Sequence, residues 1–363
     1  MFVRIDNDNN NPLFLLYSKN NFNEFKKAIE SGVNFNCINE EGTSLLQKII
    51  LNPSKISNEE NKKFFDELLN AGVHLGQIDN HSRPLDCAIE GQNDIYYMKK
   101  LLEAGSLIND YGYQCDLNYY SKRNHVMFFA ISTGRLDKIK LLLEYGADVN
   151  VLNLQNSTLL NHMLYFHKPQ ASKLLPCLLD AGINPNFKDK EGNTALHRLS
   201  SLSKHDDLEG IFYSLLKHGA KIDIKNKSGV SPFMQACRTQ NIDYLKCLIK
   251  EKVNINERTK DGATMLMACA GNTQYKSLKF LIKNNADLYA YDNHNNNVAN
   301  YILMPVNDGY KITKIQISFL KEFKSLLFTK NNSGISAMDT INTHFPKQYD
   351  DIYNYCFNDN SIK

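Results

Sequence analysis

One short helical pattern returns eight times along the chain, and this repetition limits the folds that are open to it. Each copy is a run of apolar residues spaced three or four apart, followed by glycine or a polar residue and an extended turn. The strongest copy is GRLDKIKLLLEYGADVNVLNLQN, residues 134–156. The residues that end the runs are Gly32, Gly72, Gly105, Gly146, Gly182, Gly219, Lys252 and Asn285. Three of the seven spacings between them are 33 residues, as from Gly72 to Gly105. A unit this short cannot bury its apolar face alone, so the copies are predicted to stack on one another.

A second segment recurs before these runs, after a short polar turn. Its copies are RPLDCAIEGQ, GNTALHRLS, GVSPFMQAC and GATMLMACA. The copy GNTALH, with Thr194 and His197, resembles the T-P-L-H-x-A signature of the ankyrin repeat family, and the ending from Gly146 to Asn150 resembles its G-A-D-V-N turn. The resemblance covers roughly residues 10–330. It implies an all-α fold, an α-solenoid of about eight ankyrin-like repeats of helix-turn-helix-hairpin type with a degenerate C-terminal capping repeat. It also implies that the imidazole of His197 hydrogen-bonds between adjacent repeat turns.

The polar turns set the predicted boundaries. We expect a solenoid over residues 1–330 and a polar tail, flexible or with a short helix, over residues 331–363. The repeats are predicted at roughly residues 10–41, 42–81, 82–123, 124–155, 156–191, 192–228, 229–261 and 262–295, with the cap at 296–330. Glycine suits the left-handed turn after each helix, because a Cβ costs free energy there. Lys252 lacks this freedom, and its turn is predicted to be strained or differently closed.

Composition excludes several classes of protein. Lys and Arg number 42 against 39 Asp and Glu, and a formal net charge of +3 gives no overall field that would gather nucleic acid. No run of about eighteen apolar residues occurs, and the N-terminal MFVRIDNDNNNPLF lacks the pattern of a signal peptide. The eight cysteines form no C-x-x-C pair, which favours reduced, buried thiols. The expected location is the cytoplasm, or a host cytosol if the chain is an effector of an intracellular bacterium, which its Asn- and Lys-rich composition would fit.

The sequence shows no pattern typical of an enzyme. Phosphate-binding glycine loops are absent, and no two histidines are spaced i, i+4 as zinc ligands on one helix face. No cofactor, metal site or catalytic residue is therefore predicted. The alternative is a Cys/His hydrolase with its site in an insertion, because a nucleophilic cysteine needs a nearby histidine. Against it, Cys87, Cys237 and Cys269 fall where a first helix needs a small apolar residue.

Two surface features are candidates for binding a protein partner. The first is a set of hairpin tips whose lysines would fit an acidic protein surface. Its residues are Lys188, Asp189, Lys190, Asn226 and Lys227. The second is an insertion rich in tyrosine, whose rings lose little entropy on binding. Its residues are Tyr111, Tyr113, Tyr119 and Tyr120. The plainer interpretations are solubilising charge at the tips and rings that pack the insertion onto the repeats.

The resemblance raises two further expectations. Ankyrin repeat folds bind many different proteins through their variable surfaces. The chain is therefore expected to be a non-catalytic scaffold that binds a protein through its tips and concave face. It is expected to be a monomer. The segment from Leu142 to Asn150 is similar to one that asparagine hydroxylases accept in ankyrin proteins. Asn150 is therefore a candidate for modification.

Overall fold

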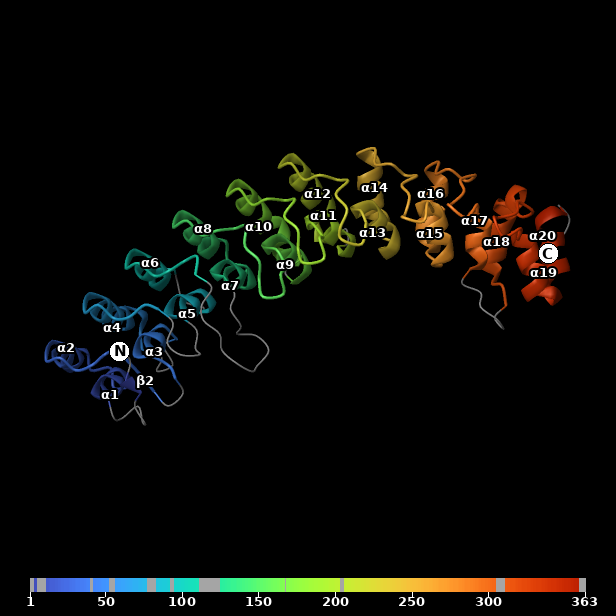
Figure 1. Cartoon of the computed structure of the whole chain (residues 1–363). Helices are drawn as coiled ribbons and strands as arrows, with labels where there is room; N and C mark the ends of the chain where they lie inside the picture. The colour runs from blue at the N-terminus through green and yellow to red at the C-terminus, as the bar shows by residue number, and fades with distance from the viewer. Residues whose placement is uncertain are drawn as a thin grey trace. The chain divides into compact units, whose positions relative to one another are not determined.

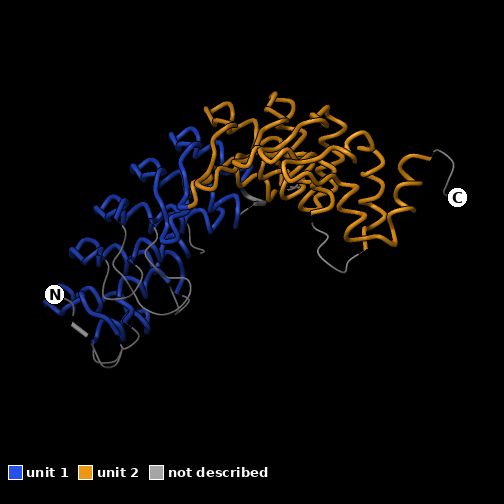
Figure 2. Tube along the Cα trace, turned by 45° about the vertical axis from the view of Figure 1, so that its right-hand side comes forward, with its two compact units in different colours: residues 1–190 blue, residues 191–363 orange. Residues whose placement is uncertain are grey.

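A computed structural model describes residues 3–4, 11–39, 42–51, 56–76, 83–91, 95–110, 125–166, 168–202, 206–304 and 311–358. The chain divides into two compact units, unit 1 over residues 1–190 and unit 2 over residues 191–363 (Figure 2). Both are built almost entirely from pairs of short helices (Figure 1). None of the described helices has the length and apolar character needed to cross a membrane.

Unit 1 contains five helix pairs in its described residues. They are α1 (Pro12–Ser18) with α2 (Phe22–Glu30), α3 (Leu45–Leu51) with α4 (Asn58–Asn70), α5 (Pro84–Glu90) with α6 (Tyr96–Glu103), α7 (Val126–Thr133) with α8 (Leu136–Glu144), and α9 (Leu159–Phe166) with α10 (Lys168–Asp180). First helices pack on first helices, as α5 does on α3 and α7, and second helices pack on second helices, as α4 does on α2. A two-residue parallel bridge joins β1 (Val3–Arg4) to β2 (Cys37–Ile38).

Unit 2 continues the same scheme in five described pairs. They are α11 (Ala195–Arg198), extended by the 3₁₀ turn η2 (Leu199–Ser201), with α12 (Leu208–Lys217), α13 (Pro232–Thr239) with α14 (Ile242–Lys250), α15 (Met265–Gly271) with α16 (Tyr275–Lys283), α17 (Val298–Leu303) with α18 (Lys314–Glu322) and the 3₁₀ turn η4 (Lys324–Leu326), and α19 (Ala337–His344) with α20 (Pro346–Phe357). Stacking runs through α13, α15, α17 and α19 and through α12, α14 and α16. The predicted all-α fold of stacked helical repeats is confirmed.

Local sequence explains where these helices begin and which side they bury. Ser231 caps α13 by accepting a hydrogen bond from the Met234 amide, and Pro232 occupies the first turn, where its missing N–H costs nothing. In the second helix α8, Ile139 and Leu142 are fully buried. Each helix therefore has one apolar face, and that face is covered by the neighbouring pair.

The turns after the second helices close in one common way. The Gly146 amide donates to the Leu143 carbonyl at 3.0 Å, with the glycine at a φ of 80°. The Lys252 amide donates to Ile249 at 3.0 Å in the same pattern, and its φ is 57°. The prediction that Lys252 closes its turn differently is therefore wrong, because the hydrogen bonds of the cap hold it in the left-handed region. The predicted strain of a Cβ-bearing residue in that region remains.

The polar segment after residue 330 contains two helices, α19 and α20, where the sequence suggested a flexible tail or a short helix. Ser336 and Asp339 form a capping box at the start of α19. Ile341 and Ile352 are buried, and the pair packs on α17 and α18. The few apolar residues of this segment are the buried ones, as Ile341 and Ile352 are. Because exposed polar residues separate them in the sequence, the helical pattern is weak there.

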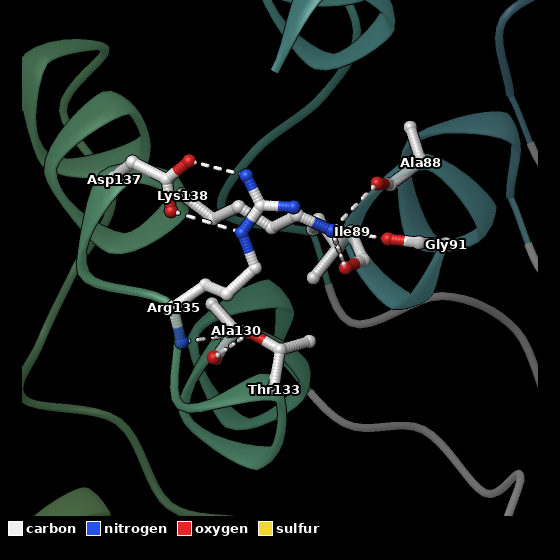
Figure 3. A network of polar contacts seen from close by, with 8 residues as sticks. All are labelled: Ala88, Ile89, Gly91, Ala130, Thr133, Arg135, Asp137 and Lys138. Carbon is white, nitrogen blue, oxygen red and sulfur yellow. Dashed lines mark hydrogen bonds and ion pairs between the residues drawn. The ribbon is translucent and has the colours of Figure 1, made fainter. Parts of the chain in front are cut away.

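The carbonyl ends of some first helices are closed by a side chain from the following pair. The Nζ atom of Lys138 in α8 donates to the carbonyl oxygens of Ala88, at 3.2 Å, of Ile89, and of Gly91, at 2.6 Å, at the end of α5 (Figure 3). Burial lowers the pKa of Lys138 to about 8. Ser277 of α16 likewise donates to the Cys237 carbonyl at the end of α13, at 2.8 Å. The last carbonyls of a helix have no amide four residues on within that helix, and these side chains of the next pair donate to them.

Candidate functional site

Two buried histidines join successive turns. The Nδ1 atom of His197 lies 3.1 Å from the Thr194 amide, which donates to it, and Nε2 lies 3.0 Å from the carbonyl of Val230 in the next turn. The predicted bridge by this imidazole is confirmed. His125 is fully buried, caps α7 through the Met127 amide, and contacts the Asn109 side chain at 3.0 Å. Burial lowers the pKa of His125 to about 4, so its ring is neutral near pH 7.

Asparagine side chains link the hairpins of neighbouring pairs. Asn109 donates to the Gly146 carbonyl at 2.9 Å and accepts from the Asp148 amide at 2.8 Å. Asn150 repeats this arrangement one pair later, with the Gly182 carbonyl at 3.2 Å and the Asn184 amide at 2.7 Å. The residue predicted as a modification site is therefore exposed, but its amide is held at both ends by the next turn.

The predicted tip residues fall into two groups. Lys188, Lys190 and Lys227 are exposed, the first two in unit 1 and the third in unit 2. Asp189 is buried and accepts a hydrogen bond from Asn161 at 3.1 Å. Asn226 accepts from the amides of its own turn and donates to Asn193 at 2.8 Å. Asp189 and Asn226 thus each stabilise their own tip through hydrogen bonds within one unit. The lysines are the residues of this set that face solvent. The predicted tyrosines at 111, 113, 119 and 120 lie outside the described residues.

An aromatic cluster lies on the first helices of unit 1, at the end of α9. The rings of Tyr165 and Phe166 contact each other with a centroid distance of 4.7 Å, and Phe166 lies 4.8 Å from the imidazole of His162. His162 lies 5.2 Å from the ring of Phe128 in α7. Phe128 is buried, whereas Tyr165 and Phe166 are 55% and 64% exposed. These four residues are called the aromatic patch below.

The patch presents apolar area on a rigid support. The buried ring of Phe128 and the half-buried His162 fix the helix face from which the outer rings extend. Edge contacts between the rings restrict their rotation before any partner arrives. An exposed pair of large rings that is already ordered costs little entropy to bind, which is the property of an interface anchor.

Comparison with known proteins identifies ankyrin repeats in part of this chain. The family model for ankyrin repeats, described as three copies, matches residues 199–292. The crystal structure of the ankyrin repeat domain of Bcl-3 matches with a TM-score of 0.52 and 22% sequence identity, over 61% of this chain and 95% of that chain. Residues 199–292 of this chain are ankyrin repeats.

Similar proteins come from viruses and from the mouse. The "Putative ankyrin repeat protein L371" of Acanthamoeba polyphaga mimivirus is 26% identical over 181 residues, which are 48% of this chain and 23% of that protein. The "Ankyrin repeat protein OPG189" of Variola virus is 25% identical over 205 residues, 55% of this chain and 35% of that protein. The B-cell lymphoma 3 protein homolog of Mus musculus is 25% identical and covers 58% of this chain and 46% of its own length. The match to this ankyrin chain therefore spans less than half of each relative.

Sequence reasoning missed the aromatic patch, although alignment of the ankyrin repeats with one another contains the signal. The last two residues of α9 are Tyr165 and Phe166. Two of the equivalent helices, α7 and α13, end in Ser-Thr at residues 132–133 and in Arg-Thr at residues 238–239. Taken by itself, the sequence of α9 suggests that Tyr165 and Phe166 continue its buried apolar face. Compared with α7 and α13, these two rings replace polar residues at the end of the helix.

The cysteines give no support to the hydrolase alternative. Burial raises the pKa of Cys87 to about 12 and that of Cys356 to about 11. A hydrogen bond with Cys269, together with burial, raises the pKa of Cys237. A nucleophile needs the opposite shift and access to substrate. Cys356, which the sequence left outside the repeats, lies buried in α20. In the part of the chain that the structure describes, no group of three His, Cys, Asp or Glu side chains could hold a metal ion.

Proposed function

We propose that this ankyrin repeat chain is a non-catalytic protein-interaction module, and that its unit 1 binds an apolar segment of a partner protein through the aromatic patch. One observation carries the proposal: Tyr165 and Phe166 are more than half exposed while their rings are fixed by neighbours. Exposed large apolar side chains gathered in one place mark interaction sites more often than single ones do. Tyrosine is also among the residues most enriched in binding hot spots.

The rest of the repeat supports a binding role over a catalytic one. The histidines and asparagines that could act in chemistry are used to join neighbouring turns, as His197 and Asn150 are. The Cys87 thiol is buried, and burial raises its pKa. What differs from repeat to repeat is the exposed surface, and the function of a repeat scaffold belongs to that surface.

The exposed lysines of the tips are proposed as a second contact that guides an acidic partner. Lys188 and Lys190 belong to unit 1, as does the aromatic patch. Charges at the rim of an interface act mainly on the association rate. Replacing both with alanine is expected to slow association a few-fold at low salt and to leave the dissociation rate almost unchanged. Surface plasmon resonance over a salt series would measure both rates.

The decisive experiment compares two matched double variants in quantitative capture from cells. The test variant is Tyr165→Ser with Phe166→Ser, and the control is Leu107→Ser with Tyr289→Ser, whose side chains are 64% and 62% exposed elsewhere. A partner held by the patch should be retained by the parent and by the control and reduced at least about tenfold by the test variant, because hot-spot residues contribute about 2 kcal/mol or more. Both variants should keep the melting temperature of the parent. Equal retention by both variants would contradict the proposal.

Modification of Asn150 and the cellular setting are also proposals. Hydroxylation at Cβ of Asn150 would leave its amide bonds to Gly182 and Asn184 in place. Peptide mass spectrometry after incubation with an asparagine hydroxylase should show one added oxygen at this residue, and an unmodified peptide would exclude it. Residence in the cytoplasm, or in a host cytosol as an effector, is supported only by composition. Imaging of the tagged chain in infected and uninfected cells would test it.

A further inference from the structure

Six exposed or half-exposed lysines gather on the second helices near the end of unit 2. They are Lys276, Lys279 and Lys283 of α16, Lys314 and Lys321 of α18, and Lys324 of η4. Glu322 is the single acidic residue within these three elements. We call the six lysines the basic face. Other second helices are close to neutral, such as α8, in which Asp137 and Glu144 balance Lys138 and Lys140.

Two lysines of the basic face contact the next second helix along unit 2. The Nζ atom of Lys279 lies 6.0 Å from the ring centroid of Phe319 in α18. The Nζ atom of Lys321 lies 4.8 Å from the ring centroid of Tyr355 in α20. Each lysine thus reaches over the next helix along unit 2. Lysines of α16 and α18 therefore lie over neighbouring second helices.

The lysines of the basic face differ from those of the preceding second helix in their ion pairs. On the preceding helix α14, Lys246 pairs with Asp243 at 3.0 Å and Lys250 pairs with Glu209 at 2.9 Å. Among the residues that the structure describes, none of the six lysines of the basic face forms such a pair. The mutual repulsion of clustered cations raises their electrostatic free energy, and an anionic surface would lower it.

Large apolar side chains stand out from the same end of unit 2. Ile315 follows Lys314 in α18 and is 51% exposed, and Phe328 follows η4 and is 53% exposed. Phe328 packs beside Phe357 of α20 at a ring distance of 5.6 Å. Lysines combined with protruding isoleucine and phenylalanine are typical of surfaces that lie in the headgroup region of a bilayer. The exposed isoleucine and phenylalanine beside the lysines favour a bilayer over an acidic protein surface.

We propose that the basic face docks unit 2 on an anionic lipid surface, with the lysines among the headgroups and Ile315 and Phe328 at the acyl boundary. This site lies in a different unit and on a different set of helices from the aromatic patch, so it stands or falls independently of the function proposed above. Each lysine near an anionic membrane strengthens binding about fivefold, and three lysines together about a hundredfold. Binding should weaken steeply with added salt, because the charges are solvent-exposed.

Co-sedimentation of the full chain with vesicles tests the proposal. The probes are vesicles of phosphatidylcholine alone and of phosphatidylcholine with about 30% phosphatidylserine. The test variant carries Lys276→Gln, Lys279→Gln and Lys283→Gln. The matched control carries Lys99→Gln, Lys140→Gln and Lys173→Gln, which are exposed lysines on second helices of unit 1 and change the net charge equally.

The parent should sediment with the anionic vesicles and not with the neutral ones. The test variant should lose about a hundredfold in partition coefficient, and the control less than about threefold. Equal losses would show that net charge, and not the basic face, governs binding, and would overturn the proposal. Absence of the parent from the anionic pellet would overturn it as well. Retention on immobilised polyglutamate without vesicle binding would assign the face to an acidic protein instead. Unchanged melting temperatures confirm that both variants are folded.

Discussion

Replacing Lys138 by methionine tests whether a buried ammonium or an apolar side chain gives the higher free energy of unfolding at this position of α8. The Lys138 side chain is fully buried, and its Nζ atom is the donor to three carbonyls that end α5 (Figure 3). Methionine keeps most of the volume, so no cavity term is expected. The change removes the ammonium's desolvation penalty but leaves the Ala88 and Ile89 carbonyls buried without this donor.

Each unsatisfied buried acceptor costs about 1–3 kcal/mol, and the Gly91 carbonyl is only partly buried. Lys138→Met is therefore expected to lower the free energy of unfolding by about 3 kcal/mol. Urea denaturation followed by circular dichroism measures this loss, and amide exchange in α5 shows whether the damage is local. The control is Lys140→Met, an exposed neighbour on α8, which should change stability by less than about 0.5 kcal/mol. A gain in stability, or a loss no larger than that of the control, would refute the reasoning. The desolvation penalty of the ammonium would then be at least as large as the free energy of its three hydrogen bonds.

Two further changes address the turns. The pKa of His125 is about 4 in the folded chain and about 6.5 when unfolded, so the unfolded chain binds more protons between these values and stability falls with acidification. The loss should be about 2 kcal/mol between about pH 7 and pH 5, and urea titrations should show a smaller loss in His125→Gln. Lys252→Gly should raise the melting temperature through a gain of about 1 kcal/mol, because glycine adopts the φ of 57° without strain. Asn285→Gly should gain less, since asparagine tolerates that region, and equal gains would contradict this explanation.

The repeat architecture could be predicted from the sequence because its constraints are local. A glycine such as Gly146 is favoured where φ is positive, and Thr194 with His197 must lie three apart for the imidazole to reach both its own turn and the next. These requirements recur with each copy, so their signal adds up along the chain. The turn that contains Gly334 and Ser336 has the same features before α19, yet the polar composition of this segment led to the prediction of a tail.

The candidate surfaces were harder to predict because exposure depends on neighbours that are distant in sequence. Asp189 occurs in a charged tip, yet its carboxylate turns inward to Asn161 of the preceding pair. Tyr165 and Phe166 continue an apolar run, yet the helix ends before any neighbour covers them. The lysines of α16 resemble ordinary solvated charge until the pairing of the lysines on α14 shows the contrast.

The side chains that close the first helices from the following pair also set an order for synthesis. Lys138 is made 50 residues after Ala88, and Ser277 is made 40 residues after Cys237. At a ribosomal rate of about 5–20 residues per second, such a helix waits about 2–10 s for its last carbonyls to be bonded. The end of a nascent first helix thus lacks these hydrogen bonds until the following pair has been synthesised. The growing chain therefore matures one pair behind the ribosome, and codons that slow translation just after a first helix would prolong the interval in which its end is open to chaperones or to aggregation.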